Sequence, residues 1–208
     1  MTREYYMDKI RITPETARIR PTEEQDVEAV LRIYDMARLT MRESGNPLQW
    51  PTDEGYPGLT ELQGDMRRGA SYAIEYEGRV VGTFALVPGK EPSYAKIHDG
   101  RWLDGAAGTE AGGHGCENGC LEHSANPAAS RPYCTIHRLA GNPAYSGIAS
   151  CCFGWCKRQC GSLRSDTHHD NIIMQKAFTK AGFVRCGIIL LENGSERTAY
   201  QWLDDGKE

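Results

Sequence analysis

The sequence has no apolar run long enough to cross a membrane and no excess of basic residues. Its 208 residues carry 24 Lys and Arg against 28 Asp and Glu, a formal net charge of −4. A general nucleic-acid binder usually shows a basic excess, so we expect no nucleic-acid partner. A spanning helix needs about 20 apolar residues, so we expect no membrane partner either. The polar N-terminus, MTREYYMDKIRITPETARIR, has no apolar signal core, which predicts a cytoplasmic protein.

Internal repeats are also absent, and 208 residues are enough for one domain with a single sizeable core. Eight cysteines are many for such a chain, but without a secretory signal a disulfide framework is not expected. Cys152, Cys156 and Cys160 recur every four residues, and with Cys151 they fall in one predicted helix. We interpret them as small buried hydrophobic side chains.

Hydrophobic periodicity predicts strands alternating with helices. The expected strands cover residues 17–20, 72–76, 79–87, 133–140, 163–167, 183–191 and 196–202, and the expected helices cover residues 22–44, 59–68, 148–160 and 171–181. Thr22 and Gln25 form a capping-box pattern at the first helix, and Asp170 is the expected N-cap of the last. Asn193-Gly194 predicts a C-terminal hairpin, which could pair across a homodimer. The order predicts an α+β fold with a mixed sheet between helices.

Residues 104–130 do not fit this pattern, because they contain six glycines and six alanines and no periodicity. We expect a Gly-rich insertion loop within one domain that spans residues 1–208. The segment HGCENGCLEH (114–123) holds two thiols and two imidazoles, His114, Cys116, Cys120 and His123, which could bind zinc tetrahedrally. Their spacing matches no specific zinc motif, so a disordered loop is favoured, and a zinc-binding interaction module is kept as an alternative function.

The most informative stretch runs from His137 to Phe183. An apolar strand enters a turn that contains Gly147, and a helix follows. The first amides of a helix have no intrahelical partner and, with the helix dipole, favour an anion. Glycine has no Cβ, so the backbone can approach a ligand closely. This arrangement predicts a pyrophosphate-binding turn.

Over about residues 19–202, apart from the insertion, the chain resembles the GNAT superfamily of acyl-CoA-dependent N-acetyltransferases. RLAGNPAYSGIAS (138–150) resembles the fourth strand and pyrophosphate turn of that family, and DTHHDNIIMQKAFTKAGF (166–183) resembles its fifth strand and following helix. The resemblance implies a GNAT-like, mostly antiparallel sheet flanked by helices. It also implies acetyl-CoA as cosubstrate and direct transfer of its acetyl group to a primary amine of a small molecule or peptide.

The resemblance also implies a set of cofactor-binding residues. Leu139 and Ala140 would bond the pantetheine arm through their backbone, and Asn171 would contact the same arm. The residues that open the central helix, Gly147, Ile148, Ala149 and Ser150, would cradle the pyrophosphate.

Three features depart from the family pattern. Ala144 replaces the usual Gln or Arg, and the turn is about two residues shorter than the common form. Phe178 stands beside the cofactor where many members have a tyrosine that protonates the leaving thiolate. Phenylalanine has no proton to give, so a non-catalytic acyl-CoA-binding protein of the same fold is an alternative function.

A general base near the amine would assist its attack, and His137 is the strongest candidate, because histidine titrates near neutrality. A structural histidine packed against the sheet is equally compatible with the pattern. Glu75 and Tyr133 are weaker candidates for the base. Trp50 either lines the acceptor site or plugs the core.

His168 and His169, with Asp166 and Asp170, could suggest a metal site at a strand-to-helix junction. Because Asp170 is the expected N-cap, we favour the capping role and predict no metal.

Overall fold

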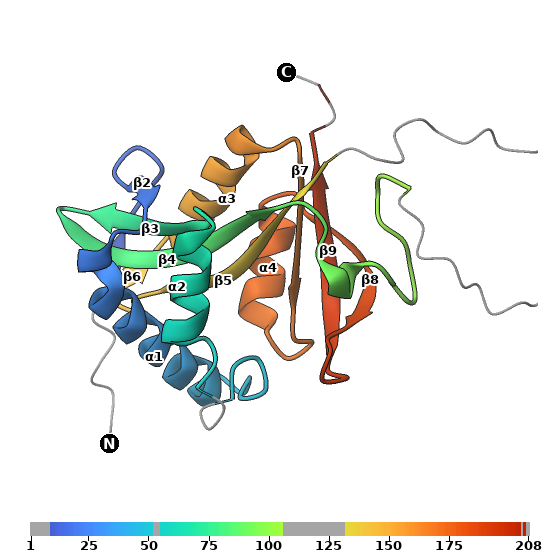
Figure 1. Cartoon of the computed structure of the whole chain (residues 1–208), viewed down its shortest axis with the longest axis horizontal. Helices are drawn as coiled ribbons and strands as arrows, with labels where there is room; N and C mark the ends of the chain where they lie inside the picture. The colour runs from blue at the N-terminus through green and yellow to red at the C-terminus, as the bar shows by residue number, and fades with distance from the viewer. Residues whose placement is uncertain (1–8, 52–54, 106–131, 205, 207–208) are drawn as a thin grey trace, which may run out of the picture.

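The computed structural model describes residues 9–51, 55–105, 132–204 and 206. Seven strands form one sheet in the order β2-β3-β4-β5-β7-β9-β8 (Figure 1). The strands are β2 (Arg18–Pro21), β3 (Ser71–Tyr76), β4 (Arg79–Pro88), β5 (Cys134–Gly141), β7 (Ser162–Thr167), β8 (Val184–Leu190) and β9 (Glu196–Leu203). All neighbours in this sheet pair antiparallel except β5 and β7, which run parallel. The predicted mixed, mostly antiparallel sheet is confirmed.

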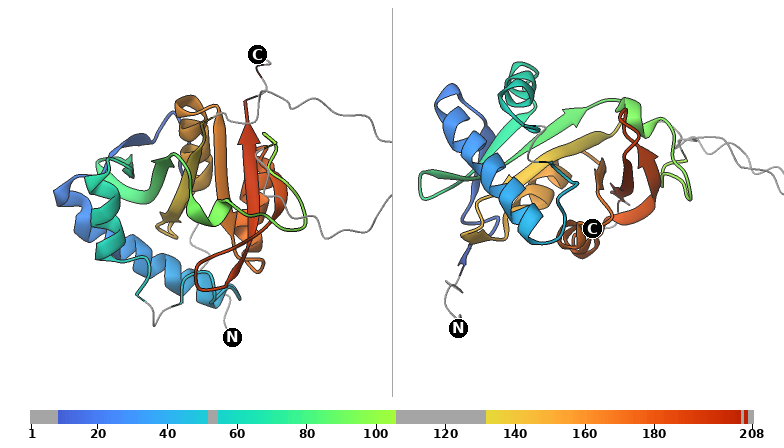
Figure 2. Two further views of the ribbon diagram at one scale, coloured as in Figure 1. Left: turned by 45° about the vertical axis from the view of Figure 1, so that its right-hand side comes forward. Right: turned by 90° about the horizontal axis from the view of Figure 1, so that it is seen from below.

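Four helices cover the two faces of the sheet (Figures 1 and 2). They are α1 (Val27–Glu43), α2 (Leu59–Arg67), α3 (Ile148–Gln159) and α4 (Ile172–Lys180), and two short 3-10 turns, η1 (Glu24–Asp26) and η2 (Pro92–Tyr94), lie in the connections. In the part of the chain that the structure describes, no helix combines the length and apolar character needed to cross a bilayer. Because α1 and α3 both contact β4 and β5 but belong to separate apolar clusters, the sheet has a core on each side.

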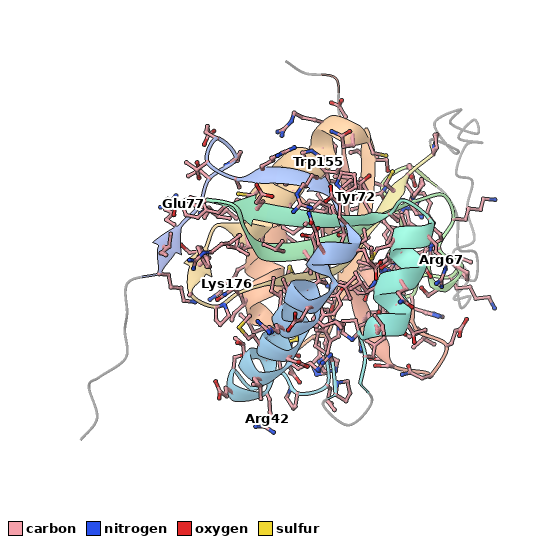
Figure 3. All side chains as sticks on the ribbon, turned by 60° about the vertical axis from the view of Figure 1, so that its left-hand side comes forward. Arg42, Arg67, Tyr72, Glu77, Trp155 and Lys176 are labelled. Atoms are coloured by element: carbon pink, nitrogen blue, oxygen red, sulfur yellow. The ribbon has the colours of Figure 1, made fainter. Side chains whose placement is uncertain are left out.

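The larger core lies under α3 and α4 and is built from aromatic rings and thiols. Phe178 of α4 stacks on Phe153 of α3 and on Tyr200 of β9, with centroids 5.2 and 4.8 Å apart. Trp155 of α3 lies on Tyr72 of β3 at 4.6 Å (Figure 3).

The cysteines of α3 are part of this core, and they are buried as predicted. Cys151, Cys152 and Cys156 are almost inaccessible to solvent, and burial raises the pKa of the Cys152 thiol well above its usual value. Cys160 instead ends the helix and is only half-buried. The six cysteines in the described part of the chain are free thiols.

The predicted start of the first helix is wrong. The backbone N–H of Glu23 donates to the Asp26 carboxylate at 2.8 Å, and α1 begins only at Val27. Thr22, the expected cap, instead accepts a hydrogen bond from the Ser71 hydroxyl of β3 at 2.8 Å. Asp26 also pairs with Arg20 of β2, so a tertiary ion pair fixes where this helix begins.

The predicted cap of the last helix is also wrong by one residue. The side chain of Asn171, and not that of Asp170, accepts from the first turn of α4, with Met174 N at 3.2 Å. The Asp170 carboxylate is therefore left to contact the neighbouring histidines.

The periodicity gave no indication of a second, two-stranded sheet. β1 (Ile10–Arg11) pairs in parallel with β6 (Tyr145–Ser146), which lies in the turn before α3. Ile10 N donates to Ala144 O and Ile12 N donates to Ser146 O, both at 2.9 Å. The N-terminal segment is thus fixed against the turn that the sequence predicts to bind pyrophosphate.

Most of the predicted insertion, including the whole 114–123 segment with its histidines and cysteines, lies outside the described residues. Asp104, the first residue of the predicted insertion, belongs to the folded domain. Its carboxylate accepts two hydrogen bonds from Arg164 of β7, at 2.8 and 2.9 Å, and both side chains are buried. The guanidinium of Arg164 is itself enclosed between the rings of Trp102 and Tyr133.

Candidate active site

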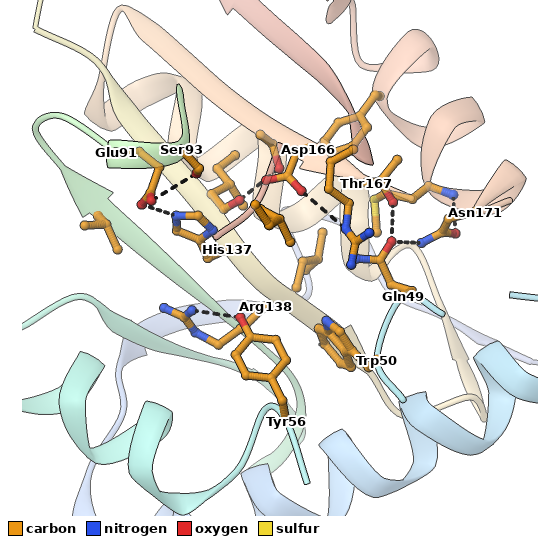
Figure 4. Close-up of a pocket in the computed structure, with 18 of the residues that line it drawn as sticks. Gln49, Trp50, Tyr56, Glu91, Ser93, His137, Arg138, Asp166, Thr167 and Asn171 are labelled. Atoms are coloured by element: carbon orange, nitrogen blue, oxygen red, sulfur yellow. Dashed lines mark hydrogen bonds and ion pairs between the residues drawn. The ribbon is translucent and has the colours of Figure 1, made fainter. Parts of the chain in front are cut away.

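The site lies where two parallel strands separate. β5 and β7 pair only at Cys134 with Leu163 and at Thr135 with Arg164, although the strands contain eight and six residues. Beyond this point a cavity of about 380 Å³ opens between β5, β7, α4 and the loop after α1 (Figure 4). The edge of β5 that faces the gap keeps backbone groups that the parallel pairing does not use, so an extended ligand arm can bond there.

His137 lines this cavity on β5, and its Nε2 lies 3.1 Å from a carboxylate oxygen of Glu91 (Figure 4). The hydrogen bond with His137 lowers the pKa of Glu91, outweighing partial burial, so the carboxylate is ionised at neutral pH. An ionised carboxylate only accepts, so the hydrogen of this bond lies on Nε2. The pair is suited to taking a proton from an amine.

A second acidic group lines the cavity at Asp166 of β7. It accepts a hydrogen bond from the Tyr94 hydroxyl at 2.7 Å, and Arg197 of β9 lies 4.0 Å away. Burial, followed by the nearby Asp166 charge, raises the pKa of Tyr94 well above its usual value, so the phenol stays protonated and donates. Asp166 is therefore held in place by buried partners.

Gln49 ties the loop after α1 to the end of β7. Its Oε1 accepts from the Thr167 hydroxyl at 2.8 Å, from His168 N at 2.7 Å and from the Asn171 amide at 3.4 Å (Figure 4). The next residue, Trp50, lines the cavity and is buried, with Tyr34 and Tyr56 packed edge-on against it. Trp50 thus lines the cavity and also packs on the core, and its contact with an acceptor stays a prediction.

The residues expected to bind the cofactor fall into two groups. Leu139, Asn171 and Phe178 line the cavity, whereas the remaining ones do not. Ala140 packs in the α1 core, and the other four open α3 beyond the cavity: Gly147, Ile148, Ala149 and Ser150. The Ile148 side chain is buried against Gly82 and Gly141, so only its backbone can face a ligand.

The start of α3 has the features of an anion cradle. Gly147 is its N-cap, with a left-handed φ of 93°, and no side chain caps the helix. No acidic residue lies in the first turn. A Cβ on Gly147 would lie 2.1 Å from the carbonyl oxygen of Ile12, so the turn and the N-terminal segment pack too closely for any side chain at this position. Binding of a pyrophosphate at this turn stays a prediction.

The weaker candidates for the base do not line the cavity. Glu75 accepts from Arg20 at 2.9 Å on the far strands of the sheet. The Tyr133 hydroxyl accepts from Glu91 N at 3.0 Å, so it fixes the segment that carries Glu91.

His168, His169 and Asp170 are close enough to offer three ligand atoms to one metal ion. The rings of the two histidines lie 4.2 Å apart, and the Asp170 carboxylate approaches both, at 3.5 and 3.2 Å. Burial, and then the charge of His169, lowers the pKa of His168. The backbone N–H of Asp170 also donates to His168 Nδ1, at 3.3 Å.

Sequence reasoning missed Glu91, Gln49 and Arg138. Glu91 and Gln49 lie in segments without periodicity, far from their partners along the chain, so no local pattern indicates them. Arg138 directly follows His137, and its role depends on a local irregularity in β5 described below.

No family model and no curated protein matches the sequence. The structure is, however, similar to crystal structures of GNAT acetyltransferases. A GNAT family acetyltransferase from Streptococcus agalactiae has a TM-score of 0.72 at 24% identity, covering 92% of this chain and 96% of that chain. One from Listeria monocytogenes has a TM-score of 0.58 at 14% identity, covering 90% and 94%. A ribosomal-protein-alanine N-acetyltransferase from Brucella melitensis has a TM-score of 0.52 at 16% identity, covering 89% and 99%.

The structural neighbours of this chain are thus GNAT family acetyltransferases, and the likeness extends over nearly its whole length. The predicted GNAT-like fold is confirmed. This fold implies binding of an acyl-CoA in general, whereas identities below 25% do not identify the acceptor.

Proposed function

We propose that the protein is an N-acetyltransferase that moves the acetyl group of acetyl-CoA to a primary amine of a small molecule or peptide. The observation that carries the proposal is the His137–Glu91 pair in a cavity at the point where β5 and β7 separate. A proton acceptor beside an open strand edge is what attack of an amine on a bound thioester requires, and the position of this pair supports His137 in that role.

The residues present fit acetyl-CoA. The free edge of β5 at Leu139 would bond the pantetheine arm, and the uncapped amides at the start of α3 would hold the pyrophosphate. Asn171 lies at the cavity, but its Oδ1 already caps α4 and its Nδ2 already donates one hydrogen to Gln49, so the second Nδ2 hydrogen is what this side chain can offer a ligand. When bound, acetyl-CoA supplies the activated acetyl group.

Transfer by direct attack follows from these roles. The acceptor reaches the site as an ammonium, and Nδ1 of His137 takes one proton from it, directly or through water. Glu91 stabilises the imidazolium that forms, because its carboxylate is ionised and bonded to Nε2. The amine nitrogen then bonds to the acetyl carbon, the C–S bond breaks, and the thiolate leaves with the electron pair. The nitrogen loses its second proton to water as it becomes an amide, and this proton is the one that reaches the thiolate. Phe178 is buried between aromatic rings and has no proton to give, so we propose that water protonates the thiolate.

The test combines binding and turnover. In a thermal-shift titration, acetyl-CoA at 100 times its dissociation constant should stabilise the protein by about 2.7 kcal/mol. Thiol release with a panel of amines then reports transfer. His137→Gln should keep the thermal shift and lose about 10²- to 10⁴-fold in kcat, the usual contribution of a general base. His98→Gln is the matched control, because His98 is exposed and lines neither cavity found in the described residues.

Two outcomes would count against the proposal. No thermal shift at millimolar acetyl-CoA would refute binding and the function with it. A clear shift without thiol release from any amine would instead favour the non-catalytic acyl-CoA-binding protein.

A further inference from the structure

A bulge in β5 turns two consecutive side chains toward the same cavity. Opposite Phe84 of β4, strand β5 has two residues, because Thr83 pairs with Ala140 while Ala85 pairs with His137. One of these two residues, Arg138, has a left-handed backbone with φ of 52°. In a regular strand successive side chains point to opposite faces, whereas a bulge re-aims them. As a result, His137 and Arg138 both line the cavity (Figure 4).

Arg138 is fixed by a buried carboxylate on α2. Its Nε and Nη2 donate to the two oxygens of Asp65, at 2.7 and 2.8 Å, and its Nη1 lies 3.3 Å from the Tyr56 hydroxyl. Burial alone would lower the pKa of Arg138, but Tyr56 and Asp65 raise it, so the guanidinium stays charged. This bidentate pair already neutralises Asp65.

A second arginine binds the same carboxylate. Arg68, the C-cap of α2, donates from Nη2 to Asp65 Oδ1 at 2.5 Å and also lines the cavity. Its side chain is 61% exposed, against 11% for Arg138 and 1% for Asp65. Two guanidinium groups on one carboxylate leave this cluster, Asp65 with Arg68 and Arg138, with a net charge of +1. Neutralising Asp65 does not require Arg68, so its exposed guanidinium is available to a ligand in the cavity.

Away from this cluster, two carboxylates line the cavity. Glu91 is ionised beside His137, and Asp166 is bonded by Tyr94 next to Arg197. An acceptor with an ammonium at one end and an anion at the other would therefore be oriented. Its ammonium would face His137 and Glu91, and its anion would face the arginine cluster.

We propose that the acceptor carries a carboxylate, or a comparable small anion, in addition to the amine that is acetylated, and that Arg68 and Arg138 bind this anion. This inference rests on the proposed function and narrows its acceptor to amino-acid-like molecules or peptides with a free carboxylate. Arginine suits the task because its planar donors match the two oxygens of a carboxylate.

The experiment compares amines in matched pairs. Single amino acids and dipeptides are assayed beside their carboxamides, with thiol release giving kcat and KM. Wild-type protein should prefer the carboxylate member by about 10- to 100-fold in kcat/KM, the factor of one charge-assisted hydrogen bond. The preference should appear mainly in KM, because the anion is bound equally before and during the reaction. Arg68→Gln should remove most of it.

Arg67→Gln is the matched control, because it removes a charge from the adjacent exposed residue of α2, which does not line the cavity (Figure 3). It should keep the full preference. Equal kcat/KM for carboxylates and carboxamides in the wild type would overturn the inference. The inference would also be overturned if Arg67→Gln lost as much of the preference for carboxylates as Arg68→Gln does, or if Arg68→Gln lost the thermal shift with acetyl-CoA. By contrast, no thiol release with any amine would refute the proposed function itself, and the acceptor class with it.

Discussion

The substitution Gly147→Ala is the most direct test of the proposed pyrophosphate turn. The new Cβ would lie 2.1 Å from the Ile12 carbonyl oxygen, a distance that forces the turn or the N-terminal segment to move. The left-handed φ of 93° adds about 1–2 kcal/mol for a residue with a Cβ. Forcing an atom into a packed site typically costs about 1–3 kcal/mol more.

Together these effects lower the free energy of unfolding by about 2–5 kcal/mol. For a chain of this size each kcal/mol shifts Tm by about 2–4 °C, so we expect a fall of roughly 4–20 °C. The displaced turn should also lose the stabilisation by acetyl-CoA that we expect for the wild type. Thermal unfolding with and without acetyl-CoA measures both effects in one experiment.

Gly154→Ala in the same helix is the control. A Cβ there meets only the Arg158 guanidinium, at 3.9 Å, and alanine in a helix interior is better than glycine by about 0.5–1 kcal/mol. This variant should be slightly stabilised and bind acetyl-CoA normally. If Gly147→Ala kept both the wild-type Tm and the acetyl-CoA shift, the turn would not pack against Ile12 as described and would not bind the pyrophosphate.

Three further predictions concern capping, the acceptor loop and pH. Asn171→Ala should lower the free energy of unfolding, measured in urea, by about 1 kcal/mol, whereas Asp170→Ala should change it by no more than about 0.5 kcal/mol. The reverse order would indicate that Asp170 is the cap. Gln49→Ala leaves three donors at the β7–α4 junction without the oxygen that they share, so it should lower the free energy of unfolding by about 1–3 kcal/mol and raise the KM of the amine substrate. An unchanged KM would show that this loop does not contribute to binding of the amine. The hydrogen bond from Arg20 lowers the pKa of Asp26 in the folded protein. The ionised Asp26 therefore stabilises the fold fully above its pKa in the unfolded chain, about 3.9, and this stabilisation is lost as the pH falls through the folded pKa. Asp26→Asn should thus be less stable than wild type at pH 7, and the difference should shrink below about pH 4; a difference independent of pH would contradict the ion-pair explanation.

Regular elements were predictable because each buries one face and so imposes a period on the sequence. The apolar stripe along α1 predicts a helix, and the alternation of apolar and other residues in β3 predicts a strand, without any tertiary information. The start of α1 was not predictable, because the ion pair between Asp26 and Arg20 of β2, a tertiary contact, helps to fix it. β1 and β6 were missed because two residues are too few to show a period.

The candidate site was predictable only where local sequence determines it. Gly147 is recognisable because a left-handed N-cap with no room for a Cβ requires glycine. Glu91 was not, since it meets His137 from 46 positions away along the chain, and no pattern links the two. Arg138 was hidden for another reason: the stretch around it is compatible with a regular strand, and an arginine gives no sign of a left-handed backbone.

The left-handed backbone at Arg138 also limits how this protein can diverge. Glycine, asparagine and aspartate accept such a backbone readily, whereas β-branched residues do not, so few neutral substitutions are open at this position. Arg68, at the exposed end of α2, has no such restriction. Among descendants of this chain that adopt new acceptors, variation should therefore accumulate first at position 68, while position 138 changes rarely and together with the register of its strand.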